Sequence, residues 1–362
     1  MTKPISRIRL LIFGLFITFL FWFSLDIATR VILSIQTKST DFLLYGMRAS
    51  QRVKHENIRD ADGKILYHKC IPSKSKRNPV NSSGFRGKEI QTKKPDSNRI
   101  ICLGGSTTYG LNLDYKDTYP KLLQDILDVR AGKNRYEVIN AGMSALTLPK
   151  ITSLAENEMV SLKPDIIILM SLINNLLVGT EWQKFSFFII AGKEKNFILR
   201  TGRKLKRKII QYSAFANLVD GLVKRGFKKV LWGFDWNEFS TALLSSETVW
   251  EKFESDLNRL LDVLFNSNPS IKVILVEQPV DSIDYPEMKK PFERAIGILR
   301  KVSSTHENVQ TVNVYEAITD AQKEGEKVWM AAYADPVHFS RKGNEIIAEV
   351  LTEHLLSSSA YP

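Results

Sequence analysis

The sequence predicts an α/β protein, a three-layer α/β/α sandwich around a flavodoxin-like parallel five-stranded sheet, with a transmembrane helix at the N-terminus. Short, largely apolar runs that fit buried strands recur at residues 100–103, 136–140, 166–170, 271–276 and 309–314. Segments with helical spacing of apolar residues separate or follow them, at residues 119–129, 151–162, 248–264 and 344–356. Short apolar strands that alternate with helices are typical of a parallel sheet covered on both faces.

A long apolar run near the N-terminus predicts the membrane anchor. It extends from Leu10 to Leu25, is preceded by Lys3, Arg7 and Arg9, and is interrupted by Asp26. Its length is at the short end for a spanning helix, which needs about 20 mostly apolar residues. A cleaved signal peptide is the alternative, but no small-x-small cleavage site follows the run. Because basic flanks stay in the cytoplasm, we expect a cytoplasmic N-terminus and the rest of the chain outside it, periplasmic or at the cell surface.

Composition divides the chain into three regions. Residues 1–35 are the expected cytoplasmic tip and anchor, and residues 36–95 a linker and small cap with a hairpin turn at Asp62-Gly63. Residues 96–358 hold the alternating strands and helices. Within them, residues 176–245 break the alternation, and we expect an insertion there over one end of the sheet.

The net charge of +12 raises the question of a nucleic-acid partner. The basic residues do not gather on a recognition helix, a zinc site or an aromatic-studded strand, so no nucleic acid is expected. They crowd at residues 74–94 and 193–208, where a solvated surface and attraction to an anionic surface are both open. Of the two cysteines, Cys102 lies in a predicted strand as a small buried hydrophobe, and whether it pairs with Cys70 stays open.

Four segments that could carry chemistry fall at strand ends or just before the last helix. They are Gly104-Gly105-Ser106, Gly142, Asn174-Asn175 and Asp335-Pro-Val-His338. Taken singly, the glycine and asparagine segments could be ordinary turns, and an Asp-x-x-His sequence can occur by chance. In open parallel sheets, however, ligands bind beyond the carboxyl ends of the strands, so we expect these segments to meet at one site.

The residue types in these segments suit acyl chemistry. Two glycines permit a tight turn that presents the Ser106 hydroxyl. A carboxylate three residues before His338 can hold one imidazole nitrogen while the other faces the serine. A glycine at 142 lets a backbone N–H approach a substrate oxygen closely, and an asparagine amide can donate to a developing oxyanion.

Taken in order, these segments resemble the blocks of the SGNH hydrolases, also called GDSL esterases and lipases, over most of residues 81–356. Gly104-Gly-Ser106 resembles the nucleophile block, Gly142 the oxyanion glycine, Asn174 the oxyanion asparagine, and Asp335-Pro-Val-His338 the Asp-x-x-His block. The stretches 81–87, 99–110 and 163–165 are similar to a bacterial, membrane-anchored extracytoplasmic branch.

The sequence departs from the family pattern at two positions. Gly105 stands where the Gly-Asp-Ser signature has aspartate. The Gly-x-Asn-Asp block is replaced by Leu172-Ile-Asn174-Asn175, which lacks the glycine.

The resemblance implies a serine esterase that hydrolyses an O-acyl or O-acetyl ester through an acyl-enzyme on Ser106, with His338 as base and Asp335 as its partner. It implies oxyanion donors from the backbone N–H groups of Ser106 and Gly142 and from the Asn174 side chain, with no metal or organic cofactor. The expected partners are the membrane and an ester-bearing substrate, such as an acylated polysaccharide or lipid. The alternatives are an acyltransferase acting on a cell-envelope polysaccharide and a catalytically silent envelope-binding protein with this fold.

Overall fold

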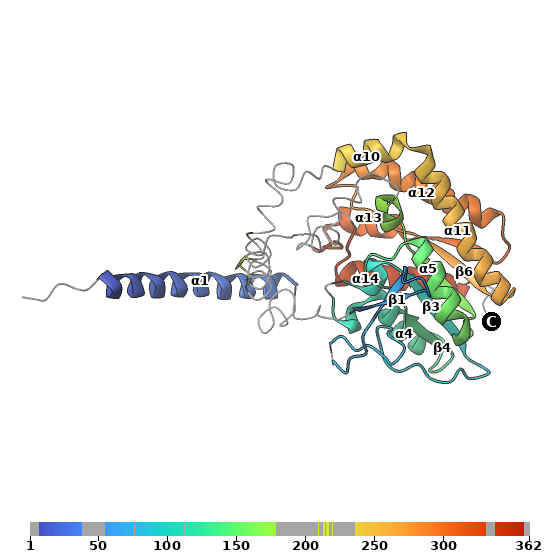
Figure 1. Ribbon diagram of the computed structural model, residues 1–362, viewed down its shortest axis with the longest axis horizontal. Coiled ribbons are helices and arrows are strands. Elements are labelled where there is room, and N and C mark those ends of the chain that lie inside the picture. Colours follow the sequence, from blue (N-terminus) through green and yellow to red (C-terminus); the bar gives the residue numbers. More distant parts are fainter. Residues whose placement is uncertain are drawn as a thin grey trace, which may run out of the picture. The chain divides into compact units, whose positions relative to one another are not determined.

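The structure is a computed structural model (Figure 1). It describes residues 7–37, 55–75, 77–111, 113–178, 236–330 and 337–357, and also Ile209, Ser213, Phe215, Ala216 and Val219. The chain forms two compact units, Met1–Arg52 with Lys193–Leu231, and Val53–Gly192 with Trp232–Pro362. Most of the expected insertion and the expected site residue Asp335 lie outside the described residues.

The second unit is built on a parallel sheet. Within the described residues its strands are, in spatial order, β4 (Tyr136–Asn140), β3 (Asn98–Gly104), β5 (Ile166–Met170), β6 (Lys272–Glu277) and β7 (Val309–Asn313). Every neighbouring pair is parallel. The first strand in the chain therefore lies between the second and the third, which is the flavodoxin-like order. The predicted fold class is confirmed.

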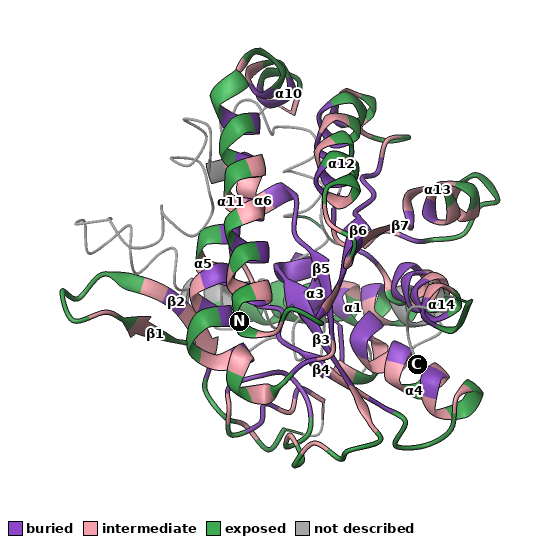
Figure 2. Cartoon of the chain, turned by 90° about the vertical axis from the view of Figure 1, so that its right-hand side faces the viewer, coloured by how far each residue is buried: buried purple, intermediate pink, exposed green. Residues whose placement is uncertain are grey.

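Two layers of helices cover the sheet, because alternate residues of each strand face opposite sides. In β3, Ile101 and Leu103 pack in one apolar cluster, while Ile100 and Cys102 pack in the other. The first cluster includes residues of α5 (Leu148–Leu154), α10 (Trp236–Ser245), α11 (Glu247–Ser267) and α12 (Lys289–Ser304). The second includes residues of α4 (Tyr119–Arg130), α13 (Tyr315–Lys323) and α14 (Arg341–Ser357). Figure 2 shows the buried strands between these layers.

The helices α10, α12 and α13 were not expected from the sequence, although α12 carries a clear pattern. Its buried residues Phe292, Ala295, Ile296 and Leu299 recur at helical spacing between lysines and arginines. The helix expected over residues 151–162 is present from Leu148 onward, but its geometry changes twice along its length. The helix α5 ends at Leu154, a wide turn covers Ala155–Met159, and a tight turn covers Val160–Leu162 before Lys163, whose φ is 52°.

A small hairpin precedes the sheet. Its strands β1 (His55–Arg59) and β2 (Ile65–Cys70) are antiparallel, with Gly63 at φ 79° in the connection, so the turn expected at Asp62-Gly63 is confirmed.

The thiols of Cys70 and Cys102 are both buried and free, so these two residues form no disulfide.

The first unit contains α1 (Arg7–Thr37), whose stretch Ile12–Ile32 has a mean hydropathy of 1.9. This one N-terminal helix is long and apolar enough to cross a membrane. It extends well beyond Leu25, where the apolar run ends in the sequence, so Asp26 does not interrupt it.

The charge of Asp26 is accommodated by hydrogen bonds inside the same unit. Its carboxylate accepts from Arg30 Nε at 2.7 Å, Ser213 Oγ at 2.8 Å and the Phe215 backbone N–H at 3.0 Å. The rings of Trp22 and Phe215 meet edge to face at 5.1 Å. A residue of the expected insertion therefore contacts the apolar helix directly.

Candidate active site

The candidate nucleophile lies where β3 ends. Ser106 is the first residue of α3 (Ser106–Tyr109), a single turn that follows the two glycines, and its exposed fraction is 8%. A Cβ on Gly104 would lie 2.2 Å from Thr108 Oγ1 and 2.3 Å from the Met170 carbonyl oxygen. Only glycine fits this position, so the tight turn expected from the sequence has a steric cause.

His338 lies beside this serine, although 232 residues separate the two in the chain. Its Nε2 is 2.9 Å from Ser106 Oγ, a hydrogen-bond distance at which a neutral imidazole accepts from the hydroxyl. The structure therefore brings two of the three expected catalytic residues together. The third, Asp335, lies outside the described residues.

Packing around the next residue holds the histidine segment in place. The rings of Trp329 and Phe339 stack at 4.8 Å, and the Met330 N–H donates to the His338 carbonyl at 3.0 Å. Trp329 Nε1 in turn donates to Gln322 Oε1 at 2.9 Å, and Gln322 Nε2 donates to the buried Asp281 at 2.8 Å. The histidine segment is thus tied to α13 and to the loop after β6 through side chains that the sequence analysis did not single out.

Asn174, in α6 (Ile173–Val178), lies against the nucleophile turn. Its Nδ2 donates to the Leu146 carbonyl at 2.9 Å and lies 2.4 Å from where a Cβ on Gly105 would be. A side chain at position 105, such as the aspartate of the Gly-Asp-Ser signature, would require the Asn174 amide to shift. Asn175 has a different place: its Oδ1 accepts from the Leu148 N–H at 2.6 Å, at the start of α5.

Gly142 lies under the same turn. A Cβ there would lie 2.4 Å from the Tyr109 nitrogen and 2.6 Å from the Thr108 carbonyl carbon, so glycine is required for close packing. Its own N–H donates to Asn140 Oδ1 at 3.0 Å. In this state the expected oxyanion donor is already engaged.

Ala145, three residues further on, is a second backbone donor on the same loop. It has a φ of 62°, a left-handed conformation that costs an alanine about 1–2 kcal/mol. No described residue accepts a hydrogen bond from its N–H. Strained backbone of this kind clusters at functional sites. The sequence offered no signal for it, since nothing marks an alanine as left-handed.

No family model and no curated protein matches the sequence. Among solved structures, the chain is similar to the acetyl xylan esterase AlAXEase, at 17% identity over 71% of this chain and 98% of that one, with a TM-score of 0.45. It is similar to a variant of Axe2, an acetyl-xylooligosaccharide esterase from Geobacillus stearothermophilus, at 14% identity over 75% and 99%, with a TM-score of 0.46. It is also similar to a GDSL-like lipase from Parabacteroides merdae, at 15% identity over 74% and 98%, with a TM-score of 0.44.

The sheet order and the positions of the sequence blocks agree with the resemblance noted above. The chain has the flavodoxin-like α/β/α fold that this resemblance implies. At these identities and TM-scores the similarities say nothing of this chain's chemistry, which depends on its own atoms.

The contact between Gly105 and Asn174 gives a direct prediction. Asn174 is expected from the sequence to be an oxyanion donor, and on that expectation Gly105→Ala should lower kcat about 100-fold, because the new methyl pushes the Asn174 amide away. Steady-state hydrolysis of p-nitrophenyl acetate measures the change. Gly297→Ala is the matched control, since a Cβ there meets nothing within 4 Å and should leave kcat unchanged. A fully active Gly105→Ala variant would contradict this role of the glycine.

The hairpin contacts the same loop through a half-buried histidine. His68 Nε2 lies 2.8 Å from the Ser144 carbonyl oxygen, next to Ala145, so this nitrogen carries the proton. Burial lowers the pKa of His68 to about 4. The ring therefore stays neutral in the folded protein at pH values where it is protonated in the unfolded chain.

This difference predicts a loss of stability in acid. Between about pH 6.5 and 4 the unfolded chain binds a proton here that the folded chain does not, so the free energy of unfolding falls as the pH falls. We expect His68→Gln to remove up to about 3 kcal/mol of this decrease, because glutamine can keep the donor without titrating. Urea unfolding at pH 7, 5.5 and 4 measures it. Equal pH slopes in the variant and the wild type would show that this ring does not titrate as described.

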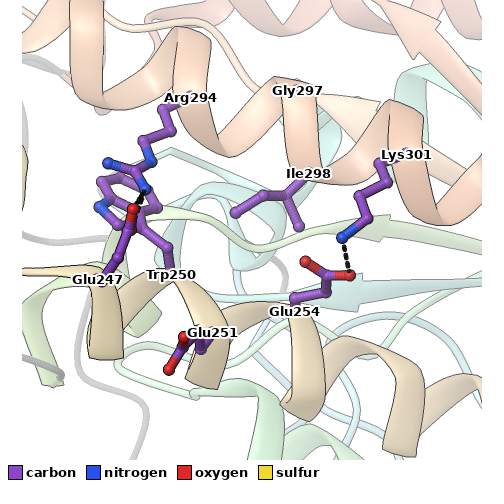
Figure 3. Close-up of a pocket in the computed structure, with 8 residues that line it drawn as sticks. All are labelled: Glu247, Trp250, Glu251, Glu254, Arg294, Gly297, Ile298 and Lys301. Atoms are coloured by element: carbon purple, nitrogen blue, oxygen red, sulfur yellow. Dashed lines mark hydrogen bonds and ion pairs between the residues drawn. The ribbon is translucent and has the colours of Figure 1, made fainter.

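A groove of about 400 Å³ lies between α11 and α12, away from these residues (Figure 3). Arg294 pairs with Glu247 over the Trp250 ring, and Lys301 pairs with Glu254 at 2.7 Å. Ion pairs of this exposed kind are common on surfaces and contribute little. The groove shares no residue with the candidate site.

Proposed function

We propose that this chain is a membrane-anchored serine esterase that removes an O-acyl group, such as O-acetyl, through an acyl-enzyme on Ser106. The observation that carries the proposal is the 2.9 Å approach of Ser106 Oγ and His338 Nε2 at the carboxyl end of β3. A serine hydroxyl is a weak nucleophile until an adjacent base can take its proton. No other described serine is hydrogen-bonded to a histidine side chain at the carboxyl end of a strand.

In the proposed reaction, the Ser106 oxygen attacks the ester carbonyl as His338 Nε2 takes the hydroxyl proton. The tetrahedral intermediate then expels the alcohol, which receives that proton from the imidazole. Water repeats the sequence on the acyl-enzyme and releases the acid. We assign to Asp335 the role of orienting and stabilising the imidazolium, as the Asp-x-x-His spacing suggests.

The oxyanion needs donors aimed at the position where its charge develops. The Ser106 N–H, in the first turn of α3, has no partner inside that helix. Asn174 Nδ2 has a second hydrogen beyond the one donated to Leu146. Gly142 can serve only by exchanging its bond to Asn140 for one to the oxyanion, whereas Ala145 on the same loop is already unengaged.

A product assay identifies whether water or a sugar hydroxyl accepts the acyl group. Transfer to a sugar hydroxyl would use the same serine and histidine as hydrolysis. Incubation of the full-length protein in detergent with p-nitrophenyl acetate, with and without a sugar acceptor, should yield acetate in both cases. Acetylated sugar in place of acetate would identify an acyltransferase. No turnover with either acceptor would favour a catalytically silent binding protein.

We further propose that α1 anchors the chain with its N-terminus in the cytoplasm and the candidate active site outside it. The proposal is supported by the apolar stretch Ile12–Ile32 and by Lys3, Arg7 and Arg9 before it. Protease added to intact spheroplasts should digest the hydrolase domain while a cytoplasmic control protein survives. A protected domain, or a freely soluble mature protein that begins after residue 25, would contradict the anchor.

A further inference from the structure

Arg86 is a buried cation next to the nucleophile turn, and the proposed reaction does not use it. It lies in the stretch before the sheet, and its exposed fraction is 2%. Burial of a charged side chain is costly unless hydrogen bonds replace its hydration. Its contacts therefore indicate what this residue is retained to do.

The guanidinium binds mainly backbone oxygens at the end of α3. Its Nη1 donates to the carbonyls of Tyr109 at 2.5 Å and Gly110 at 2.8 Å, and its Nη2 donates to that of Leu113 at 2.6 Å. Nη2 also donates to Asn78 Oδ1. The guanidinium carbon lies 4.7 Å from the centre of the Tyr109 ring. The two terminal nitrogens of the planar guanidinium thus bind three backbone carbonyls, those of residues 109, 110 and 113, in the segment that follows Ser106.

The backbone of Arg86 fastens a second part of the site. Its N–H donates to the Asn140 carbonyl at 3.2 Å, at the end of β4. Asn140 in turn holds the Gly142 N–H through its side chain. One residue is therefore bonded both to the nucleophile turn and to the strand end that leads into the oxyanion loop.

The turn needs such support because it is short. The helix α3 has four residues, and an isolated helix of this length is not stable in water. Its closing bonds run from the N–H groups of Gly110 and Leu111 to the Ser106 carbonyl, so the serine and the carbonyls that Arg86 binds move together. A shift at the end of the turn would shift Ser106 relative to His338.

We infer that Arg86 is a positioning residue that holds Ser106 in reach of His338, an inference that rests on the proposed function. Lysine at this position keeps the charge but carries its three donors on one nitrogen, so it cannot reproduce the fork in which Nη1 holds the carbonyls of Tyr109 and Gly110 and Nη2 holds that of Leu113. A purely structural role would lower stability without a specific effect on the chemical step. A positioning role lowers kcat and leaves KM nearly unchanged, because substrate binding does not depend on the serine's alignment.

The test compares Arg86→Lys with Arg77→Lys in the full-length protein. Arg77 lies near the same segment, and its side chain pairs with the Asp114 carboxylate at 3.0 Å. For Arg86→Lys we expect kcat for p-nitrophenyl acetate to fall about 10- to 100-fold, the loss typical of a misplaced reacting group. KM should change less than about twofold, and labelling by a fluorophosphonate should slow by the same factor as kcat. For Arg77→Lys we expect a lower Tm with unchanged kcat.

The outcomes separate the inference from the proposed function. If the wild type is reactive and a folded Arg86→Lys variant is equally reactive, the inference alone is overturned. It is also overturned if kcat falls as much in Arg77→Lys as in Arg86→Lys. A wild type that neither turns over nor reacts with the fluorophosphonate overturns both. If Arg86→Lys does not fold, Asn78→Ala decides, since it removes one acceptor of the guanidinium and keeps the cation. A several-fold loss of kcat at constant KM supports the inference, and an unchanged kcat overturns it.

Discussion

Replacement of Ser106 by alanine is expected to abolish ester hydrolysis, lowering kcat by about 10⁴-fold or more. The change removes the only atom that forms the acyl-enzyme in the proposed mechanism. It should leave the fold intact, because the serine lies in a turn and the loss of one hydroxyl creates no apolar cavity. Hydrolysis of p-nitrophenyl acetate measures the activity, and circular dichroism with a thermal scan checks the fold.

Ser240→Ala is the matched control for this variant. Ser240 is a buried serine of α10 whose hydroxyl donates to the Glu287 carbonyl at 2.7 Å. The same chemical change there should cost some stability and leave kcat unchanged. If Ser106→Ala keeps wild-type activity, nucleophilic catalysis by this serine is ruled out.

Replacement of His338 by glutamine is expected to lower kcat about 10⁴-fold, because no base then removes the proton of Ser106. Glutamine keeps a polar side chain of moderate size, and the backbone bond from Met330 to residue 338 is retained. The protein should therefore fold. The rates of p-nitrophenyl acetate hydrolysis and of fluorophosphonate labelling measure the loss.

His306→Gln is the control for the histidine. His306 follows α12, and its Nδ1 lies 3.0 Å from the Val302 carbonyl oxygen, just before the start of β7 and so at the opposite end of the strands from Ser106. This variant should remain fully active. An active His338→Gln protein would mean that another group serves as the base.

The sequence predicted those elements that a short stretch of neighbouring residues is enough to indicate. Each strand of the sheet is a short apolar run, and the glycines before Ser106 mark a tight turn wherever they occur. The approach of Ser106 and His338 could be anticipated because parallel strands bring their carboxyl ends to one edge of the sheet.

Contacts between distant segments explain what the sequence did not predict. The helix α1 continues past Asp26, whose carboxylate accepts a hydrogen bond from Ser213, 187 residues away in the chain. The need for glycine at 105 depends on the amide of Asn174 in another helix. The engagement of the Gly142 N–H and the left-handed backbone of Ala145 arise from the shape of one loop, which residue types alone do not specify.

Covalent labelling by a fluorophosphonate, followed by mass spectrometry of the digested protein, tests the central claim most directly. The reagent is captured by a serine that an adjacent base activates, so its attachment point reports the nucleophile without knowledge of the substrate. We predict a single adduct on the peptide that contains Ser106, absent from Ser106→Ala and formed far more slowly in His338→Gln. An unlabelled wild type, or an adduct elsewhere that persists in Ser106→Ala, would contradict the assignment of Ser106 as the nucleophile.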